Sequence, residues 1–262
     1  MAVQELAVPR QSIDIVFGQY KEQLVALLRY DRFRVNETPQ EWVHLLGPDV
    51  SSLTHPEVTA NITERFIAYN AAHGTNLSLA DEVLLQTAAR THDWGELTIA
   101  GKGVGDVTFE AKMGAHEQVE LQIFSYLLGL IPEDADRKLI KRAYTEIALD
   151  KRSRLGQMFN AIERLGYLET AIRAYQGVDG KRISNWQGLV GNVLSNQIEA
   201  LLKYSQEYPY VQFVIESNRG IVGEMLSAVL AADVFIDNQG KPSYDRTKLE
   251  RSQAAWSGKP VL

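Results

Sequence analysis

Apolar residues recur every three or four positions along most of the 262-residue chain, which is the spacing of one face of an α-helix. Residues 210–215 are aromatic and β-branched, as in a strand, but a single strand would lack a partner, so we expect a helix or an extended loop there. The pattern therefore predicts an all-α protein. The expected helices cover residues 11–30, 55–72, 78–92, 115–131, 136–151, 154–176, 184–207 and 219–232.

The expected helix 55–72 has a histidine at the head of its apolar face. Thr54 is suited to cap this helix, a proline follows in the first turn, and Glu57 can complete a capping box. The apolar stripe consists of His55, Val58, Ile62, Phe66 and Tyr69. His55 is therefore expected to face the protein interior.

A second histidine ends the apolar stripe of the next expected helix. After Leu85, Ala88 and Ala89, this stripe reaches His92, which Asp93 follows directly. A buried imidazole and a buried carboxylate are each costly unless paired, and one divalent cation satisfies both. The simpler alternative is a buried histidine that donates a hydrogen bond to its neighbouring carboxylate.

A carboxylate also falls on an apolar face further along the chain. The expected inward face around residues 137–151 is formed by Leu139, Ala143, Ile147 and Asp150. Asp150 occupies a position where an apolar residue would be expected. It is therefore the fourth candidate metal ligand.

The order of a histidine, a His-Asp doublet and a distant aspartate, all on helices, resembles the HD-domain metal-dependent phosphohydrolases. Glu96, the Gly105-Asp106-Val107-Thr108 turn, Lys112 and Glu117 are similar to the pattern of the 5′-deoxynucleotidase-type members. The resemblance covers roughly residues 29–175, and a doublet followed by these features is more specific than an isolated His-Asp pair.

This resemblance implies an HD-type helical core over residues 1–177 and a helical C-terminal extension over 178–262. It also implies one divalent metal ion, of the kind of Mn, Co, Mg, Zn, Fe or Ni. The ion would polarise a phosphate ester and activate water near neutral pH. The expected ligands are His55, His92, Asp93 and Asp150.

Two further acidic residues are candidates for catalysis. Glu96 lies one helical turn beyond Asp93 and is expected to manage the proton of the attacking water, although a solvated helix-end carboxylate is the alternative. Asp106 follows a glycine and is expected to face the water or the leaving sugar oxygen, whereas an ordinary turn aspartate is equally consistent with the sequence.

Basic residues offer a grip on the substrate phosphate. Lys112 can act as a point charge, while Arg32 and Arg34 can bind a phosphate through two hydrogen bonds each. Outside the resemblance, each would be taken as a surface cation. His116, at the start of the helix 115–131, is a possible second-metal or phosphate contact, or a helix-start hydrogen bond.

Composition narrows the possible functions. There is no cysteine, which excludes disulfides, thiolate metal sites and cysteine nucleophiles. A net charge of -6 argues against a nucleic-acid polymer as partner, because polymer binding depends on clustered Lys and Arg. No run of residues has the layout of a signal peptide or the length of a membrane span. We therefore expect a cytoplasmic protein without a membrane partner.

By resemblance, the substrate is a small-molecule nucleotide, with a (deoxy)nucleoside 5′-monophosphate the first choice and nucleoside and phosphate the products. Members of the family also cleave triphosphates and cyclic diesters, and many form homodimers. Two alternatives remain open. One is an HD-fold di-iron oxygenase, for which His116 would supply the extra histidine. The other is a catalytically silent nucleotide-binding protein.

Overall fold

In this computed structural model of the protein, the structure describes residues 9, 12–14, 54–96, 114–177, 182, 185–236 and 240–258. The described residues form helices joined by short loops, and the only β-type pairing among them is an isolated bridge between Ile236 and Pro242. The all-α prediction is thus confirmed. None of the described helices is both long and apolar enough to cross a membrane.

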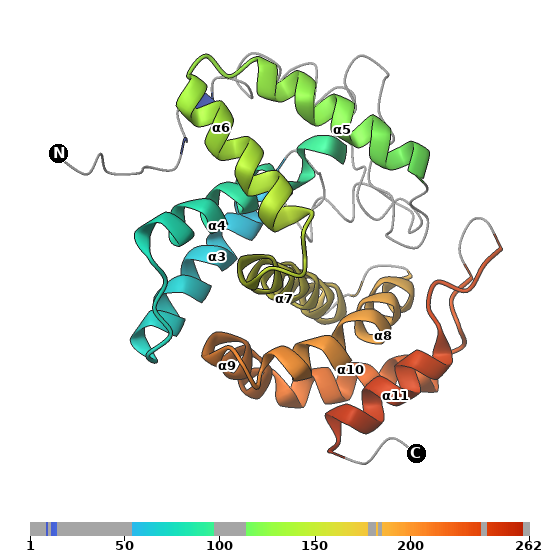
Figure 1. The fold of residues 1–262 in the computed structure, drawn as a ribbon. Coiled ribbons are helices and arrows are strands. Elements are labelled where there is room, and N and C mark those ends of the chain that lie inside the picture. The colour runs from blue at the N-terminus through green and yellow to red at the C-terminus, as the bar shows by residue number, and fades with distance from the viewer. Residues whose placement is uncertain are drawn as a thin grey trace. The chain divides into compact units, whose positions relative to one another are not determined.

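The helices follow one another in a simple order along the chain (Figure 1). They are α3 (His55–Ala72), α4 (Leu79–Thr91), the 3-10 helix η2 (His92–Glu96), α5 (Gly114–Gly129), α6 (Asp134–Ala143), the π-helical turn η4 (Tyr144–Ala148), α7 (Arg154–Gln176), α8 (Trp186–Tyr204), α9 (Pro209–Ser217), α10 (Arg219–Ala231) and α11 (Arg246–Trp256). The expected spans 55–72 and 154–176 coincide with α3 and α7.

Two compact units divide these helices. The first contains residues 54–67, 76–96 and 114–160 of the described chain, and the second contains 68–75 and the described residues from 161 onward. Two long helices, α3 and α7, contribute to both units. The predicted division between a core ending at 177 and a C-terminal extension stays a prediction.

In the first unit, α4 packs against α6 and η4, while η2 packs against α5. The face of α4 that is turned inward carries Leu85, Ala88 and Ala89, which are fully buried. Ser78 begins the helix, because its side chain accepts a hydrogen bond from the backbone N–H of Asp81 at 3.2 Å. The apolar pattern of the sequence thus places the end of α4 in the interior.

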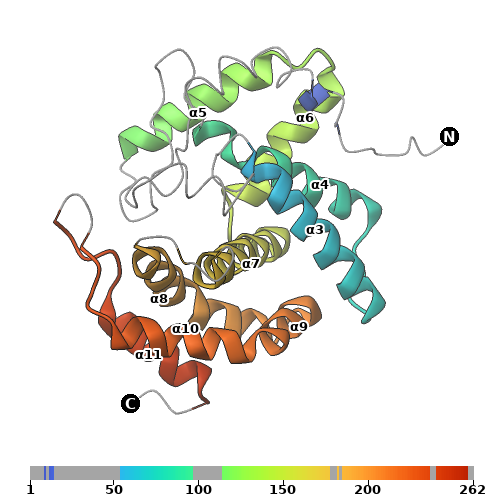
Figure 2. The same ribbon diagram turned by 180° about the vertical axis from the view of Figure 1, so that it is seen from behind.

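In the second unit, α8 packs against α9, α10 and α11, and α10 and α11 lie side by side in both ribbon views (Figures 1 and 2). The segment 210–215 belongs to the helix α9, which Pro209 begins at a position that favours proline. The expectation of a helix or an extended loop there is therefore met by the helix. The pattern had not predicted α11, whose N-cap is Asp245.

The helix that was expected to carry Asp150 ends earlier than predicted. Residues Tyr144–Ala148 form a π-helical turn, and the chain leaves the helix after it. A π-turn contains one more residue than an α-turn, so the inward face predicted from α-helical spacing is rotated beyond it. Ala143 and Ile147 are buried as expected, but Asp150 lies in the loop that follows. Its predicted position on the inward face of a helix is wrong.

Candidate metal centre

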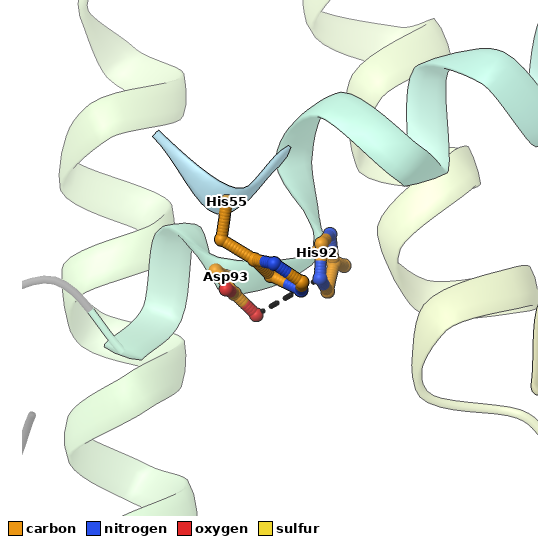
Figure 3. A group of neighbouring side chains, drawn as sticks. All are labelled: His55, His92 and Asp93. Carbon is orange, nitrogen blue, oxygen red and sulfur yellow. Dashed lines mark ion pairs between the residues drawn. The ribbon is translucent and has the colours of Figure 1, made fainter. Parts of the chain in front are cut away.

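Three of the predicted ligands come together in the first unit. One ligand atom from each of His55, His92 and Asp93 can be chosen such that all lie within 4.8 Å of one another. Figure 3 shows His55 at the start of α3 and the other two where α4 ends, with the three side chains pointing toward one another. This is the only group of three or more potential ligands found in the part of the chain that the structure describes.

His55 is held in the interior by the first turns of α3. The residue is only 6% exposed, and its Nε2 lies 3.2 Å from the hydroxyl oxygen of Thr59, one turn later. Thr59 is itself buried, and its carbonyl accepts a hydrogen bond from Thr63. The imidazole of His55 therefore has a fixed neighbour on its own helix, which limits its rotation. Sequence analysis did not single out Thr59, although its spacing of four from His55 was a usable signal.

Glu57 does not complete the expected capping box with Thr54. Its carboxylate instead accepts two hydrogen bonds from Arg90 on α4, at 2.6 and 2.7 Å. The helix start is closed by the backbone bond from the N–H of Glu57 to the carbonyl of Thr54, at 3.1 Å. A long-range partner thus displaces the local one that the sequence pattern predicts.

His92 is oriented by the last turn of α4. Its Nδ1 lies 2.9 Å from the carbonyl oxygen of Ala89, and because a carbonyl can only accept, Nδ1 carries the hydrogen of this bond. The other nitrogen, Nε2, lies 3.1 Å from Oδ1 of Asp93. A backbone carbonyl on the far nitrogen is a common way to fix a metal-binding imidazole.

The short contact between His92 and Asp93 requires a positive charge. With Nδ1 protonated, a neutral imidazole presents a lone pair at Nε2, which would face the lone pairs of the carboxylate. A proton on Nε2 or a cation bound by both atoms removes this repulsion. A proton needs only these two residues, whereas a cation also explains why His55 converges on them. The ring centroids of His55 and His92 are 5.4 Å apart.

The donor set suits a divalent transition metal. Two imidazole nitrogens and one carboxylate oxygen are the ligand types that such ions take in the absence of thiolates. Ligand atoms about 2.1 Å from one ion lie roughly 3 to 4 Å from one another, which is compatible with a group this compact. Three protein ligands are also the number that catalytic metal sites use, because a further position stays open for water or substrate.

The 3-10 helix η2 is locked in place by close packing at Gly95. A β-carbon there would lie 2.6 Å from the hydroxyl of Tyr144 on η4 and 2.9 Å from the carbonyl oxygen of Glu120 on α5. The Tyr144 ring in turn stacks on Phe124, with centroids 3.7 Å apart. The position of Asp93 thus depends on a contact that only glycine permits.

Asp150, the fourth predicted ligand, lies apart from this group. Its Oδ1 accepts hydrogen bonds from the backbone N–H and the Nε of Arg152, each at 3.1 Å, and its side chain is 39% exposed. The Arg152 hydrogen bond holds the pKa of Asp150 below its ordinary value. A β-carbon at Gly156 would meet the Asp150 carbonyl oxygen, so α7 packs tightly on this backbone. The arrangement does not support Asp150 as a ligand.

The remaining predicted residues are placed only in part. Glu96 ends η2, and because side chains three apart in a 3-10 helix lie above one another, it extends from the same side as Asp93. It is not a member of the ligand group, and neither is His116 on α5. The predicted residues Asp106, Lys112, Arg32 and Arg34 lie outside the described residues.

Comparison with known proteins gives no further assignment. No protein-family model, curated protein or solved structure matches the chain. The resemblance to the HD-domain phosphohydrolases therefore stays a hypothesis, which depends on the residues of the site.

Proposed function

We propose that the chain is a metal-dependent phosphohydrolase of the HD-domain type, acting on a nucleoside phosphate. The observation that carries the proposal is the convergence of His55, His92 and Asp93 within 4.8 Å, from the two ends of the chain segment 55–93. An HD-type site needs a histidine on one helix and a His-Asp doublet at the end of the next, which is the arrangement in this unit.

A divalent cation held by these three side chains would act as a Lewis acid toward a phosphate oxygen and make water acidic enough to attack near neutral pH. The protein's part is orientation. The carbonyl of Ala89 directs Nε2 of His92 toward Asp93, and Thr59 restrains His55. Glu96, on the side of η2 that carries Asp93, is proposed to accept the proton of the attacking water.

The proposed substrate is a deoxynucleoside 5′-monophosphate, cleaved to nucleoside and phosphate. Within the proposal, Lys112, Arg32 and Arg34 bind the phosphate, and Asp106 acts near the leaving oxygen. A cytoplasmic location and a homodimer are part of the same proposal. The net charge of -6 accords with a small nucleotide rather than a polymer as partner.

The donor set also favours a second candidate function. Two histidines and one carboxylate with open positions are the ligands of non-haem iron(II) oxygenases. His116 lies outside the ligand group, so no described residue supplies the second-iron site of the di-iron alternative. An oxygen assay with iron(II) belongs in the same experiment.

The test is phosphate release from a panel of ribo- and deoxynucleoside mono- and triphosphates, with Mn²⁺, Co²⁺ or Mg²⁺ added to chelator-treated protein. We expect metal-dependent release by the wild type, loss of release in Asp93→Asn, and unchanged release in the control Asp134→Asn, whose carboxylate is exposed and paired with Lys138. Release that persists in Asp93→Asn contradicts the proposal. Oxygen consumption with iron(II), without phosphate release, favours the oxygenase.

A further inference from the structure

An ion pair joins α3 and α4 close to the candidate metal centre. Nη1 of Arg90 lies 2.6 and 2.7 Å from the two carboxylate oxygens of Glu57, and Nη2 lies 3.7 Å from the carboxylate of Glu64, on the same helix. The Arg90 side chain is 8% exposed, whereas that of Glu57 is 60% exposed. The cation is therefore buried against α3, and its acidic partners lie at the surface.

The ion pair has the same polarity along the chain as the ligands. Glu57 comes two residues after His55, and Arg90 comes two residues before His92. The pair thus connects the start of α3 to the end of α4, which are the two places that supply the histidines. Movement of either helix end would change both the ion pair and the distance between the imidazoles.

We propose that Arg90 is a positioning residue for the metal centre, which holds the starts of α3 and the end of α4 together so that His55 and His92 reach one ion. The inference rests on the proposed metal site. A buried arginine is a poor source of net stability, because an apolar residue of similar volume often stabilises as well. Its directional contact with a carboxylate does, however, fix the relative position of two helices.

The geometry also predicts which substitutions retain this role. A single nitrogen, Nη1, contacts both oxygens of Glu57, so the contact does not require the full guanidinium fork. A lysine at position 90 can supply one ammonium for the same purpose, whereas a methionine keeps the aliphatic volume and loses the charge. Arg90→Lys should thus retain more metal affinity than Arg90→Met.

The experiment measures Co²⁺ affinity by calorimetric titration of the chelator-treated full chain, with the Co²⁺ absorption spectrum as a second readout. The variants are Arg90→Met, Arg90→Lys, Glu57→Gln and the double variant Arg90→Met/Glu57→Gln. We expect Arg90→Met and Glu57→Gln each to bind Co²⁺ about 10- to 100-fold more weakly, the range seen for outer residues that orient metal ligands. Because the two residues act as one unit, the double variant should lose little more than Arg90→Met alone.

Two controls separate positioning from general destabilisation. Arg142→Met removes an exposed ion pair with Glu146 in the same unit, at 2.8 Å, and should bind Co²⁺ as the wild type does. Circular dichroism of each chelator-treated variant identifies those that are folded. If Arg90→Met does not fold, Glu57→Gln decides the question, because its side chain is at the surface.

The outcomes are distinguishable. Wild-type affinity in folded Glu57→Gln and Arg90→Lys, or losses that simply add in the double variant, overturns the positioning role and leaves the metal site intact. A wild type that binds no Co²⁺ overturns the proposed metal site itself, and the inference with it. Weaker, non-additive binding with an altered Co²⁺ spectrum supports the inference.

Discussion

The imidazole rings of His55 and His92 meet edge to face, with their centroids 5.4 Å apart and their planes at 67°. The two residues belong to different helices, so their approach depends on how the start of α3 and the end of α4 pack in the first unit. Asp93 follows directly and completes a group of two nitrogen donors and one oxygen donor. The site is therefore a property of tertiary packing and not of one local motif.

Metal binding should stabilise the protein against heat. A ligand that binds the folded chain and not the unfolded chain adds about 2.7 kcal/mol when its concentration is 100 times the Kd. We expect a higher Tm with excess Mn²⁺ or Co²⁺ than with chelator, measured by calorimetry. The increase should vanish in His92→Gln and persist in His73→Gln, because His73 contacts the carbonyl of Tyr69 in the second unit. Equal shifts in both variants would argue against the site.

Loss of the Asp150 carboxylate should leave metal affinity unchanged. Asp150 bonds to Arg152 in the loop before α7 and lies apart from the three ligands. We therefore expect Asp150→Asn to bind Co²⁺ within about threefold of the wild type, whereas loss of a ligand costs more than the 10- to 100-fold of an outer residue. Titration calorimetry distinguishes the two. A large loss in Asp150→Asn would restore it as the fourth ligand and contradict the loop geometry described here.

A methyl group at Gly95 should destabilise the fold. The new β-carbon would meet the Tyr144 hydroxyl at 2.6 Å and a backbone oxygen at 2.9 Å, so η2 must shift. We expect Gly95→Ala to lower the free energy of unfolding by about 1 to 3 kcal/mol, the usual cost of overpacking. Urea unfolding measures it. The control is Gly129→Ala at the end of α5, where no atom lies within 4 Å and the change should be neutral or slightly stabilising. Equal effects would refute the close packing.

Tyr175, in the second unit, should make the fold sensitive to alkaline pH. Burial, followed by the hydrogen bond that its hydroxyl donates to Glu224 at 2.6 Å, raises its pKa above the ordinary value of 10.0. The unfolded chain then loses this proton first, so the free energy of unfolding falls as the pH rises above 10.0. In Tyr175→Phe this part of the decline should be absent. Urea unfolding at pH 8 and above pH 10 compares the two proteins, and equal declines would contradict the assignment.

The helices were predictable because their apolar spacing is local. The spans of α3 and α7 follow from the recurrence of residues such as Ile62, Phe66, Phe159 and Ile162, all of which are buried. The helix α11 was missed, although Leu249, Ser252 and Trp256 repeat every three or four residues and are buried, because most of its other residues are polar. Its N-cap, Asp245, was a second usable signal.

The site was predictable only where each ligand belongs to a regular helix. His55 and His92 end apolar stripes, and the structure brings them together as the sequence indicates. Asp150 was misplaced because the π-turn at Tyr144–Ala148 breaks the helical period, and no local pattern announces such a turn. The contact of Arg90 with Glu57 connects residues far apart in the sequence, so spacing within one helix cannot predict it.

The most direct test of the account is titration of chelator-treated protein with Co²⁺, comparing the wild type with Asp93→Asn. Asparagine keeps the shape of the side chain and removes the charge that faces Nε2 of His92 at 3.1 Å. We predict one Co²⁺ per chain in the wild type, weaker binding as the pH is lowered because protons compete for the ligands, and a loss of more than about 100-fold in the variant. Stoichiometric binding that is equal in both proteins, or no binding in the wild type, would contradict a metal centre formed by His55, His92 and Asp93.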